Sequence, residues 1–315
     1  MKKEGNKFIL LSGLVTTTMF LLNKLWTTLA TRKDVLSTPQ DEEYEWRFGT
    51  IRYRKQGSGT PVLCIHGLTP GSSLYEFHEL SDKLATKYEV YSLDLLGYGL
   101  SEKPNLTYTN YMYMELVIDF IKNVIKKKTN IITSNESASI AIMVCNQEAD
   151  LVGKCILCNP ANLFEMNEIP SAQTKLLKKI IDLPILGTFI YHIYMSEAMI
   201  QKNFVENYFY NPNRIKQNDI AAYLQSSHTD HSHGKYTYAS YQGRYMNTNI
   251  IHSLKAIDHS IMILASKELE NAETDVDNYL YYNASIEKVY LSRVKKLMTL
   301  ESPSKVMHYV ETFLA

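Results

Sequence analysis

The stretch Glu89-Val-Tyr-Ser-Leu-Asp94-Leu-Leu-Gly-Tyr-Gly-Leu-Ser101 decides the fold. Its first part, up to Asp94, has the length and apolar content of a short buried strand, and two glycines then force the chain into a tight turn. A similar strand, Thr60-Pro-Val-Leu-Cys-Ile, ends in His66-Gly67 earlier in the chain. Because such strands alternate with helical segments, the sequence predicts a doubly wound, mostly parallel sheet of the α/β class.

The segment Asn130-Ile-Ile-Thr-Ser-Asn-Glu-Ser-Ala-Ser139 has the pattern of a nucleophile elbow, since an apolar run leads directly into a turn of small residues and then into a helix. In the pattern G-x-S-x-G, small residues on both sides let the backbone pass close to the serine. Asn135 and Ser139 take these positions around Ser137. Asparagine tolerates a left-handed backbone and serine is small, so the pattern predicts Ser137 at the apex of the turn.

In their order along the chain, the motifs H-G, D-x-x-G-x-G-x-S and G-x-S-x-G resemble the α/β-hydrolase family from about Phe48 to the C-terminus, and the second motif is complete. The resemblance implies an α/β-hydrolase fold with a helical cap. It also implies hydrolysis of an ester or similar acyl bond, with Ser137 as the nucleophile. The oxyanion donors would be the backbone N–H groups of Leu68 and Ala138, beside His66 and Gly67.

The same resemblance leaves the acid and the base of the reaction in doubt. Relatives carry the base in a stretch like G-H-x-P-x-x-E-x-P, and counting back from Glu301 puts Lys296 at the histidine position. Lysine titrates near ~10.4 and needs strong desolvation to accept a proton at neutral pH. Leu269 stands where the acid belongs, with Glu268 and Glu270 on either side, and either serves if the loop shifts by one residue.

Two classes of function therefore stay open. The first is a serine hydrolase whose acid and base are rebuilt from unexpected residues. The second is a non-catalytic pseudohydrolase that binds a ligand or a partner. A different register of the turn places Glu136 at the apex, flanked by Ser134 and Ala138, as in dehalogenase-like enzymes with a carboxylate nucleophile.

Three histidines lie close together in Ser227-His-Thr-Asp-His-Ser-His-Gly234. A His/Asp cluster of this kind can ligate zinc, or one imidazole can serve as a substitute base. No second group with metal-site spacing accompanies it, so a polar surface loop on the cap is favoured. We expect no metal and no cofactor.

The amino-acid composition argues against nucleic acid as a partner. The chain has 315 residues, and 33 basic against 33 acidic residues leave no net charge to attract nucleic acid. The four cysteines fall in predicted strands or in the helix behind the elbow, where buried free thiols are expected, and they favour a reducing compartment. They are Cys64, Cys145, Cys155 and Cys158.

The N-terminus is apolar from Phe8 to Ala30 except for a few polar residues. A helix of about 20 residues crosses a bilayer, so this segment predicts a single membrane anchor in which Lys24 reaches the interface beside Trp26. A cleaved secretory peptide is the alternative, since Thr28-x-Ala30 fits a cleavage site. Positive charges on both sides leave the orientation open, and a cytoplasmic globular part is expected.

The predicted organisation is an anchor over 1–33, a linker over 34–45, a hydrolase core over 46–160 and 250–315, and a helical cap over 161–249. The cap segment is rich in tyrosine, isoleucine and leucine, with Pro and Gly breaks between helical stretches. Its helical core carries few charges. It therefore favours a small, apolar acyl substrate or ligand.

Overall fold

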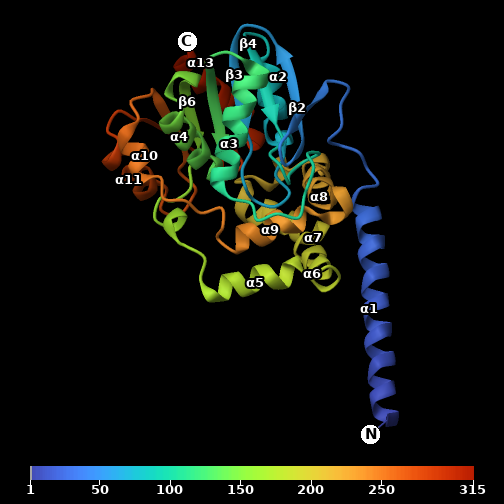
Figure 1. Ribbon diagram of the computed structural model, residues 1–315. Helices are drawn as coiled ribbons and strands as arrows, with labels where there is room; N and C mark the ends of the chain where they lie inside the picture. Colours follow the sequence, from blue (N-terminus) through green and yellow to red (C-terminus); the bar gives the residue numbers. More distant parts are fainter. Residues whose placement is uncertain (1) are drawn as a thin grey trace.

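The computed structural model describes residues 2–315, with side chains from residue 12 onward, and within that range the chain forms one eight-stranded sheet in the order β1-β2-β4-β3-β5-β6-β7-β8 (Figure 1). The first two strands pair antiparallel with their neighbours, and all other pairs are parallel. This confirms the mostly parallel sheet. The strands are β1 (Asp41–Trp46), β2 (Gly49–Gly57), β3 (Thr60–Ile65), β4 (Tyr88–Leu93), β5 (Thr129–Ser134), β6 (Val152–Cys158), β7 (Ile261–Ser266) and β8 (Glu287–Leu291).

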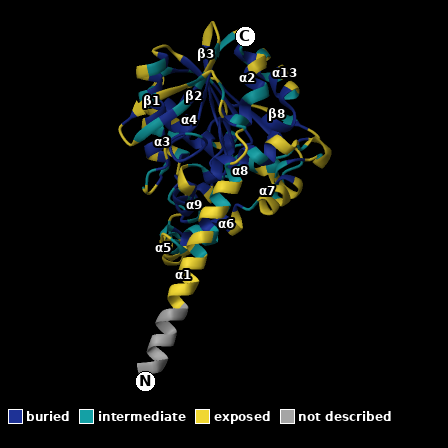
Figure 2. Ribbon diagram, turned by 90° about the vertical axis from the view of Figure 1, so that its right-hand side faces the viewer, coloured by how far each residue is buried: buried dark blue, intermediate teal, exposed yellow. Residues whose placement is uncertain are grey.

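Helices cover both faces of the sheet, which explains why its central strands are apolar along their whole length. All six residues of β5 and all six of β7 are buried, and Figure 2 shows that the interior of the globular part is made of buried residues. One face packs on α3 (Asn110–Phe120), α4 (Ala138–Gln147), α10 (Ile251–Ala256) and α11 (Ala272–Tyr282). The other packs on α2 (His78–Leu84), α12 (Met298–Glu301) and α13 (Pro303–Leu314).

A helical insertion between β6 and β7 covers the carboxyl edge of the sheet (Figure 1), as expected for a cap. It has its own apolar cluster and also contacts the loop after β4, where Ser226 Oγ accepts the N–H of Gly99 at 3.0 Å. The cap helices are α5 (Ala172–Asp182), α6 (Leu186–Tyr194), α7 (Glu197–Asn203), α8 (Gln217–Ser232) and α9 (Gly234–Gln242). Shorter helical turns occupy Leu74–Phe77, Ile121–Ile125, Asn135–Ser137, Ala149–Leu151, Glu165–Asn167, Phe204–Tyr208 and Pro212–Arg214.

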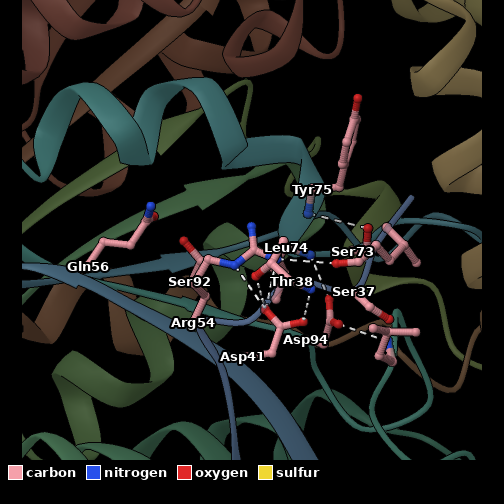
Figure 3. A network of polar contacts seen from close by, with 12 residues as sticks. Ser37, Thr38, Asp41, Arg54, Gln56, Ser73, Leu74, Tyr75, Ser92 and Asp94 are labelled. Carbon is pink, nitrogen blue, oxygen red and sulfur yellow. Dashed lines mark hydrogen bonds and ion pairs between the residues drawn. The ribbon is translucent and has the colours of Figure 1, made fainter. Parts of the chain in front are cut away.

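The turn from Asp94 to Ser101 is fixed by its own side chains. The carboxylate of Asp94 accepts the N–H of Leu74 at 2.7 Å (Figure 3) and that of Leu100 at 2.8 Å. Gly99 has a φ of +50°, and a Cβ added there would lie 2.1 Å from the carboxylate of Asp94. Only glycine fits so close to this side chain. The residues of the D-x-x-G-x-G-x-S motif therefore fix the backbone of this turn.

The N-terminal helix α1 (Lys2–Ala30) packs its last turns against α6 and α8. Its polar residues make this contact: Asn23 Nδ2 donates to the carbonyl of Ile185 at 3.0 Å, and Thr27 Oγ1 lies 2.6 Å from Ser232 Oγ. In the part of the chain that the structure describes, no helix combines the length and the apolar run that a bilayer crossing needs. The membrane helix expected over Phe8–Ala30 is thus not found, and the side chains of 8–11 lie outside the described ones.

Candidate active site

The chain turns sharply from β5 into α4, as an elbow requires, but the apex is neither of the two residues that the sequence suggested. Asn135 has the left-handed φ of +53°, directly after the last strand residue, Ser134. Glu136 and Ser137 already follow a helical course into α4. The prediction of Ser137 at the apex is therefore wrong, and so is the register with Glu136 there.

Ser137 faces the interior of the protein. Its side chain is fully buried, and its hydroxyl donates to the carbonyl of His66. The residue lies two positions past the apex, where the first turn of the helix passes β3, so its hydroxyl links the elbow to the neighbouring strand. The backbone N–H of Ala138 also has partners, because it donates to carbonyls of the same turn. It is not available as an oxyanion donor.

The carboxylate of Glu136 binds the backbone N–H that the sequence predicts as an oxyanion donor. Its Oε2 accepts the N–H of Leu68 at 3.2 Å, and its Oε1 accepts from Lys296 Nζ at 3.0 Å and from the hydroxyl of Tyr241 at 3.3 Å. The backbone N–H of Glu136 itself also favours the charged carboxylate. The N–H of Leu68, which the sequence predicts as an oxyanion donor, therefore already has an acceptor from the same chain.

Both members of this pair are charged at neutral pH. Burial alone would raise the pKa of Glu136, but the charge of Lys296 and the surrounding N–H groups outweigh it and hold the pKa below its ordinary value. Burial alone would lower the pKa of Lys296, but Glu136 outweighs it and raises the pKa above its ordinary value. Lys296 therefore keeps its proton and cannot act as a general base.

The loop that carries Lys296 is held from two sides. Asn159, at the end of β6, donates through Nδ2 to the carbonyls of Lys295 and Lys296 at 3.0 and 3.1 Å. The carboxylate of Glu301 accepts the N–H of Lys295 at 2.8 Å and that of Tyr210 in the cap at 3.0 Å. The role of Asn159 could not be predicted from the sequence.

His66 is a structural residue. Its Nε2 accepts the N–H of Leu95 at 3.1 Å, so Nδ1 carries the proton and donates to the carbonyl of Gly67 at 2.6 Å. The N–H of Gly67 donates to the buried carboxylate of Glu76 at 3.1 Å. Glu76, which sequence reasoning missed, thus fixes the same loop that presents Leu68.

The two expected acids lie in different surroundings. Glu268 accepts the N–H of Arg293 at 2.9 Å in an exposed loop. Glu270 lines a cavity of about 380 Å³ to which Glu136 and Lys296 also contribute. Among the described residues, the carboxylate that pairs with Lys296 Nζ is that of Glu136.

A second cavity, of about 350 Å³, lies between the site and the cap, and Lys296 lines it as well. The ion pair therefore stands beside both spaces. Amide side chains from the cap contribute to the second cavity: Asn203, Asn207 and Gln242. Five tyrosines also line it: Tyr194, Tyr208, Tyr223, Tyr238 and Tyr241.

The histidine cluster lies away from this site, against α1. His228 is buried and stacks on His192 with ring centroids 4.9 Å apart, so the surface loop expected there is wrong for this residue. Burial lowers the pKa of His192 to about 3 and that of His228 to about 4. Among the described residues, no three His, Cys, Asp or Glu side chains are arranged to hold a metal ion.

The four cysteines are buried free thiols, as expected. Cys145 of α4 and Cys155 of β6 bring their sulfur atoms to 3.4 Å from each other. They pack the helix behind the elbow against the sheet.

Comparisons with known proteins agree with the fold. A profile described as "Alpha/beta hydrolase family" matches residues 62–237. The 2-hydroxy-6-oxo-6-(2'-aminophenyl)hexa-2,4-dienoic acid hydrolase of Metapseudomonas resinovorans is 31% identical over 114 residues, which cover 36% of this chain and 39% of the relative. The soluble epoxide hydrolase of Corynebacterium sp. (strain C12) is 27% identical over 192 residues, covering 56% of this chain and 62% of the relative. Both matches span less than two thirds of the relative.

Solved structures extend the likeness over most of the chain. A serine hydrolase involved in carbazole degradation superposes with a TM-score of 0.68 at 16% identity, covering 87% of this chain and 98% of that one. A structure titled as a membrane phospholipase A superposes with a TM-score of 0.67 at 18% identity, covering 100% and 98%. At these identities the likeness concerns the fold alone.

Proposed function

The chain belongs to the alpha/beta hydrolase family, and on that premise we propose that it binds a small ligand beneath its cap without hydrolysing it. One observation carries this proposal: the carboxylate of Glu136 accepts the N–H of Leu68 at 3.2 Å. In a hydrolase such a donor must be free for the oxyanion of the transition state. A fixed negative charge at that place opposes the charge that the reaction would develop.

The groups that would start the reaction support the same proposal. A serine nucleophile needs a neighbouring base that takes its proton. The hydroxyl of Ser137 instead donates to the carbonyl of His66, and Lys296 stays protonated beside Glu136. At the apex itself, Asn135 offers an amide, which is not a nucleophile.

The cavity of about 350 Å³ beneath the cap supports a small molecule as the ligand. Tyrosine rings offer flat apolar faces, while Gln242 and Asn203 offer hydrogen bonds at fixed points. The relatives are named for hydrolysis of small molecules, an aminophenyl dienoic acid and an epoxide. A ligand with an aromatic or short acyl part and one polar end fits this lining.

A fluorophosphonate probe tests the absence of catalysis. We expect no labelling of the purified protein between pH 7 and 9, while an active serine esterase in the same tube is labelled. Hydrolysis of 4-nitrophenyl butyrate should not exceed the rate in buffer. Labelling that disappears in Ser137→Ala would contradict the proposal and restore the serine hydrolase of the sequence prediction.

Binding is tested separately with the same ester as the probe. Saturation-transfer NMR should detect 4-nitrophenyl butyrate bound to the unmodified protein. Gln242→Trp places a large ring in the cavity lining and should abolish the signal. Tyr281→Ala, at an exposed position of α11, is the matched control and should leave it unchanged. Equal signals from all three proteins would mean that the cavity is not the binding site.

A further inference from the structure

One end of the molecule exposes many apolar side chains that no described element covers. Leu14 is 66% exposed, Leu176 59% and Leu186 45%. Single exposed leucines are ordinary, but many exposed apolar side chains on packed neighbouring helices mark a site of contact with a partner or a lipid phase. The exposed apolar side chains come from α1, α5, α6 and the loop between the last two: Leu14, Val15, Phe20, Leu21, Leu25, Leu29, Leu176, Leu177, Leu183, Leu186, Ile193 and Tyr194. We call these residues the apolar end.

Helix α5 shows how this surface is built. Ser171 caps its first turn by accepting the N–H of Thr174 at 3.2 Å, so it is a well-formed helix. Ile181 is buried, which fixes the helix on the cap. Leu176 and Leu177 then point outward, and the exposed Lys175 and Lys179 flank them on the same helix.

Helix α1 adds to the same end. Figures 1 and 2 show α5 and α6 at the end of the globular part along which α1 runs, and α1 continues past both. Asn23 and Thr27 face the cap, where they make hydrogen bonds. Leu21, Leu25 and Leu29 occupy exposed positions on the same helix. Because α1 packs on α6 and α6 packs on α5, the exposed apolar side chains of the three helices belong to one end of the molecule.

We infer that the apolar end rests on a lipid bilayer that contains anionic headgroups. Leucines beside lysines on a short helix match the composition of interfacial segments, which lie in the headgroup region without crossing the membrane. Lys175 and Lys179 would meet anionic headgroups, while the leucines would enter the acyl boundary. This inference does not require α1 to span the bilayer, and it does not depend on the proposed ligand.

An environment-sensitive fluorophore tests the contact directly. The four native thiols are buried, so a cysteine introduced at Leu177 can be labelled with NBD in the full-length protein. Vesicles of phosphatidylcholine and phosphatidylglycerol should shift its emission to the blue and raise its intensity at least twofold. NBD at Tyr281→Cys, on an exposed part of α11, should not respond. An unchanged Leu177→Cys signal would overturn the inference, whether or not the protein sediments with the vesicles.

Charge provides an independent measurement. Two lysines near an anionic surface should strengthen binding by about 30-fold in total, from about fivefold for each. The pair Lys175→Gln/Lys179→Gln should weaken partition onto anionic vesicles by about this factor. The matched control is Lys126→Gln/Lys128→Gln, two exposed lysines before β5 at the opposite edge of the sheet, with no expected effect. Equal partition of both variants would contradict the inference.

A second copy of the chain is the competing occupant of the apolar end. In that case the protein would be a dimer without lipid, and Leu176→Glu/Leu186→Glu would convert it to a monomer by light scattering. This result would overturn the bilayer contact. We expect instead that the same substitutions leave the mass unchanged and reduce vesicle binding.

Discussion

The turn Asp94–Ser101 and the elbow Ser134–Ala138 leave the same edge of the sheet, because β4 and β5 both run parallel to β3. In the first turn every notable polar group binds backbone: Asp94 accepts two N–H groups, and Ser101 Oγ donates to the carbonyl of Asp94 at 2.7 Å. In the elbow Ser137 also binds backbone, but the carboxylate of Glu136 accepts from the side chains of Lys296 and Tyr241 in addition to the N–H of Leu68. One turn keeps the family pattern and the other departs from it.

This difference separates two uses of polar residues in the family. Groups that satisfy buried backbone must be present for the fold, since an orphaned N–H costs free energy wherever it lies. Groups that perform chemistry can be replaced if the replacements satisfy one another. Glu136 and Lys296 do so, and together they also satisfy the N–H of Leu68. On the proposed function, the fold therefore persists without the reaction.

The largest expected effect comes from breaking the ion pair. Lys296→Met leaves the buried carboxylate of Glu136 without a cation, which should lower the free energy of unfolding by about 3–5 kcal/mol. Urea denaturation at pH 7 measures this loss. Adding Glu136→Gln should recover most of it, because the glutamine oxygen still accepts from Leu68 and no charge remains. If Lys296→Met is as stable as the unmodified chain, the pair does not hold the elbow.

The turn after β4 should respond less, and without recovery by a partner. Asp94→Asn keeps one oxygen acceptor but turns an NH₂ group toward the second N–H, so about 1.5–3 kcal/mol should be lost. Asp82→Asn is the matched control, since Asp82 accepts only an exposed hydrogen bond from Gln56. If Asp94→Asn and Asp82→Asn lower the free energy of unfolding equally, the N–H of Leu74 and the N–H of Leu100 must bind water in place of the Asp94 carboxylate.

The sequence predicted those parts of the molecule that local pattern determines. The buried strands are continuous apolar runs, the glycines of Asp94–Ser101 require a positive φ, and the cap shows a change to helical spacing. Lys296 was placed by its distance from Glu301, and the contact of Glu301 with the N–H of Lys295 explains why this spacing holds. Each of these features depends on residues close together in the chain.

The predictions that were wrong depend on the register of a turn or on contacts between residues far apart in the chain. The apex was placed two residues late, because β5 stays buried through Ser134 and no glycine marks where the strand ends. The pairing of Glu136 with Lys296 joins residues 160 positions apart, which no local pattern reveals. In α1, Asn23 and Thr27 contact the cap, which the apolar run of this segment did not indicate.

Acid should have a smaller effect on the elbow than either substitution, because a protonated carboxyl still accepts hydrogen bonds. The pKa of Glu136 is below its ordinary value of 4.5 in the folded chain, so its stabilisation is complete above about pH 4.5 and is lost as the pH falls through the folded pKa. The difference in unfolding free energy between the unmodified chain and Glu136→Gln should therefore shrink in that range.

Two buried histidines also make the free energy of unfolding depend on pH, but over a different pH range from Glu136. With pKa values lowered to about 3 and about 4, His192 and His228 weaken the fold as the pH falls below 6.5, in both proteins alike. Their contribution therefore cancels when the unfolding free energy of Glu136→Gln is subtracted from that of the unmodified chain. A difference between the two proteins that stays constant from pH 7 to pH 3 would mean that Glu136 is not charged in the folded chain.

The smallest expected effect concerns Ser137. Ser137→Ala removes one buried hydrogen bond to the carbonyl of His66 and should cost about 1 kcal/mol. Because the hydroxyl contacts backbone in the way that Ser101 does, the variant should behave as a structural change only: a slightly lower midpoint in urea, with ester hydrolysis and fluorophosphonate labelling at the same background level. Ser101→Ala provides the comparison at the other turn. If the rate of ester hydrolysis falls in Ser137→Ala and not in Ser101→Ala, Ser137 takes part in catalysis and the proposal of a non-catalytic protein is wrong.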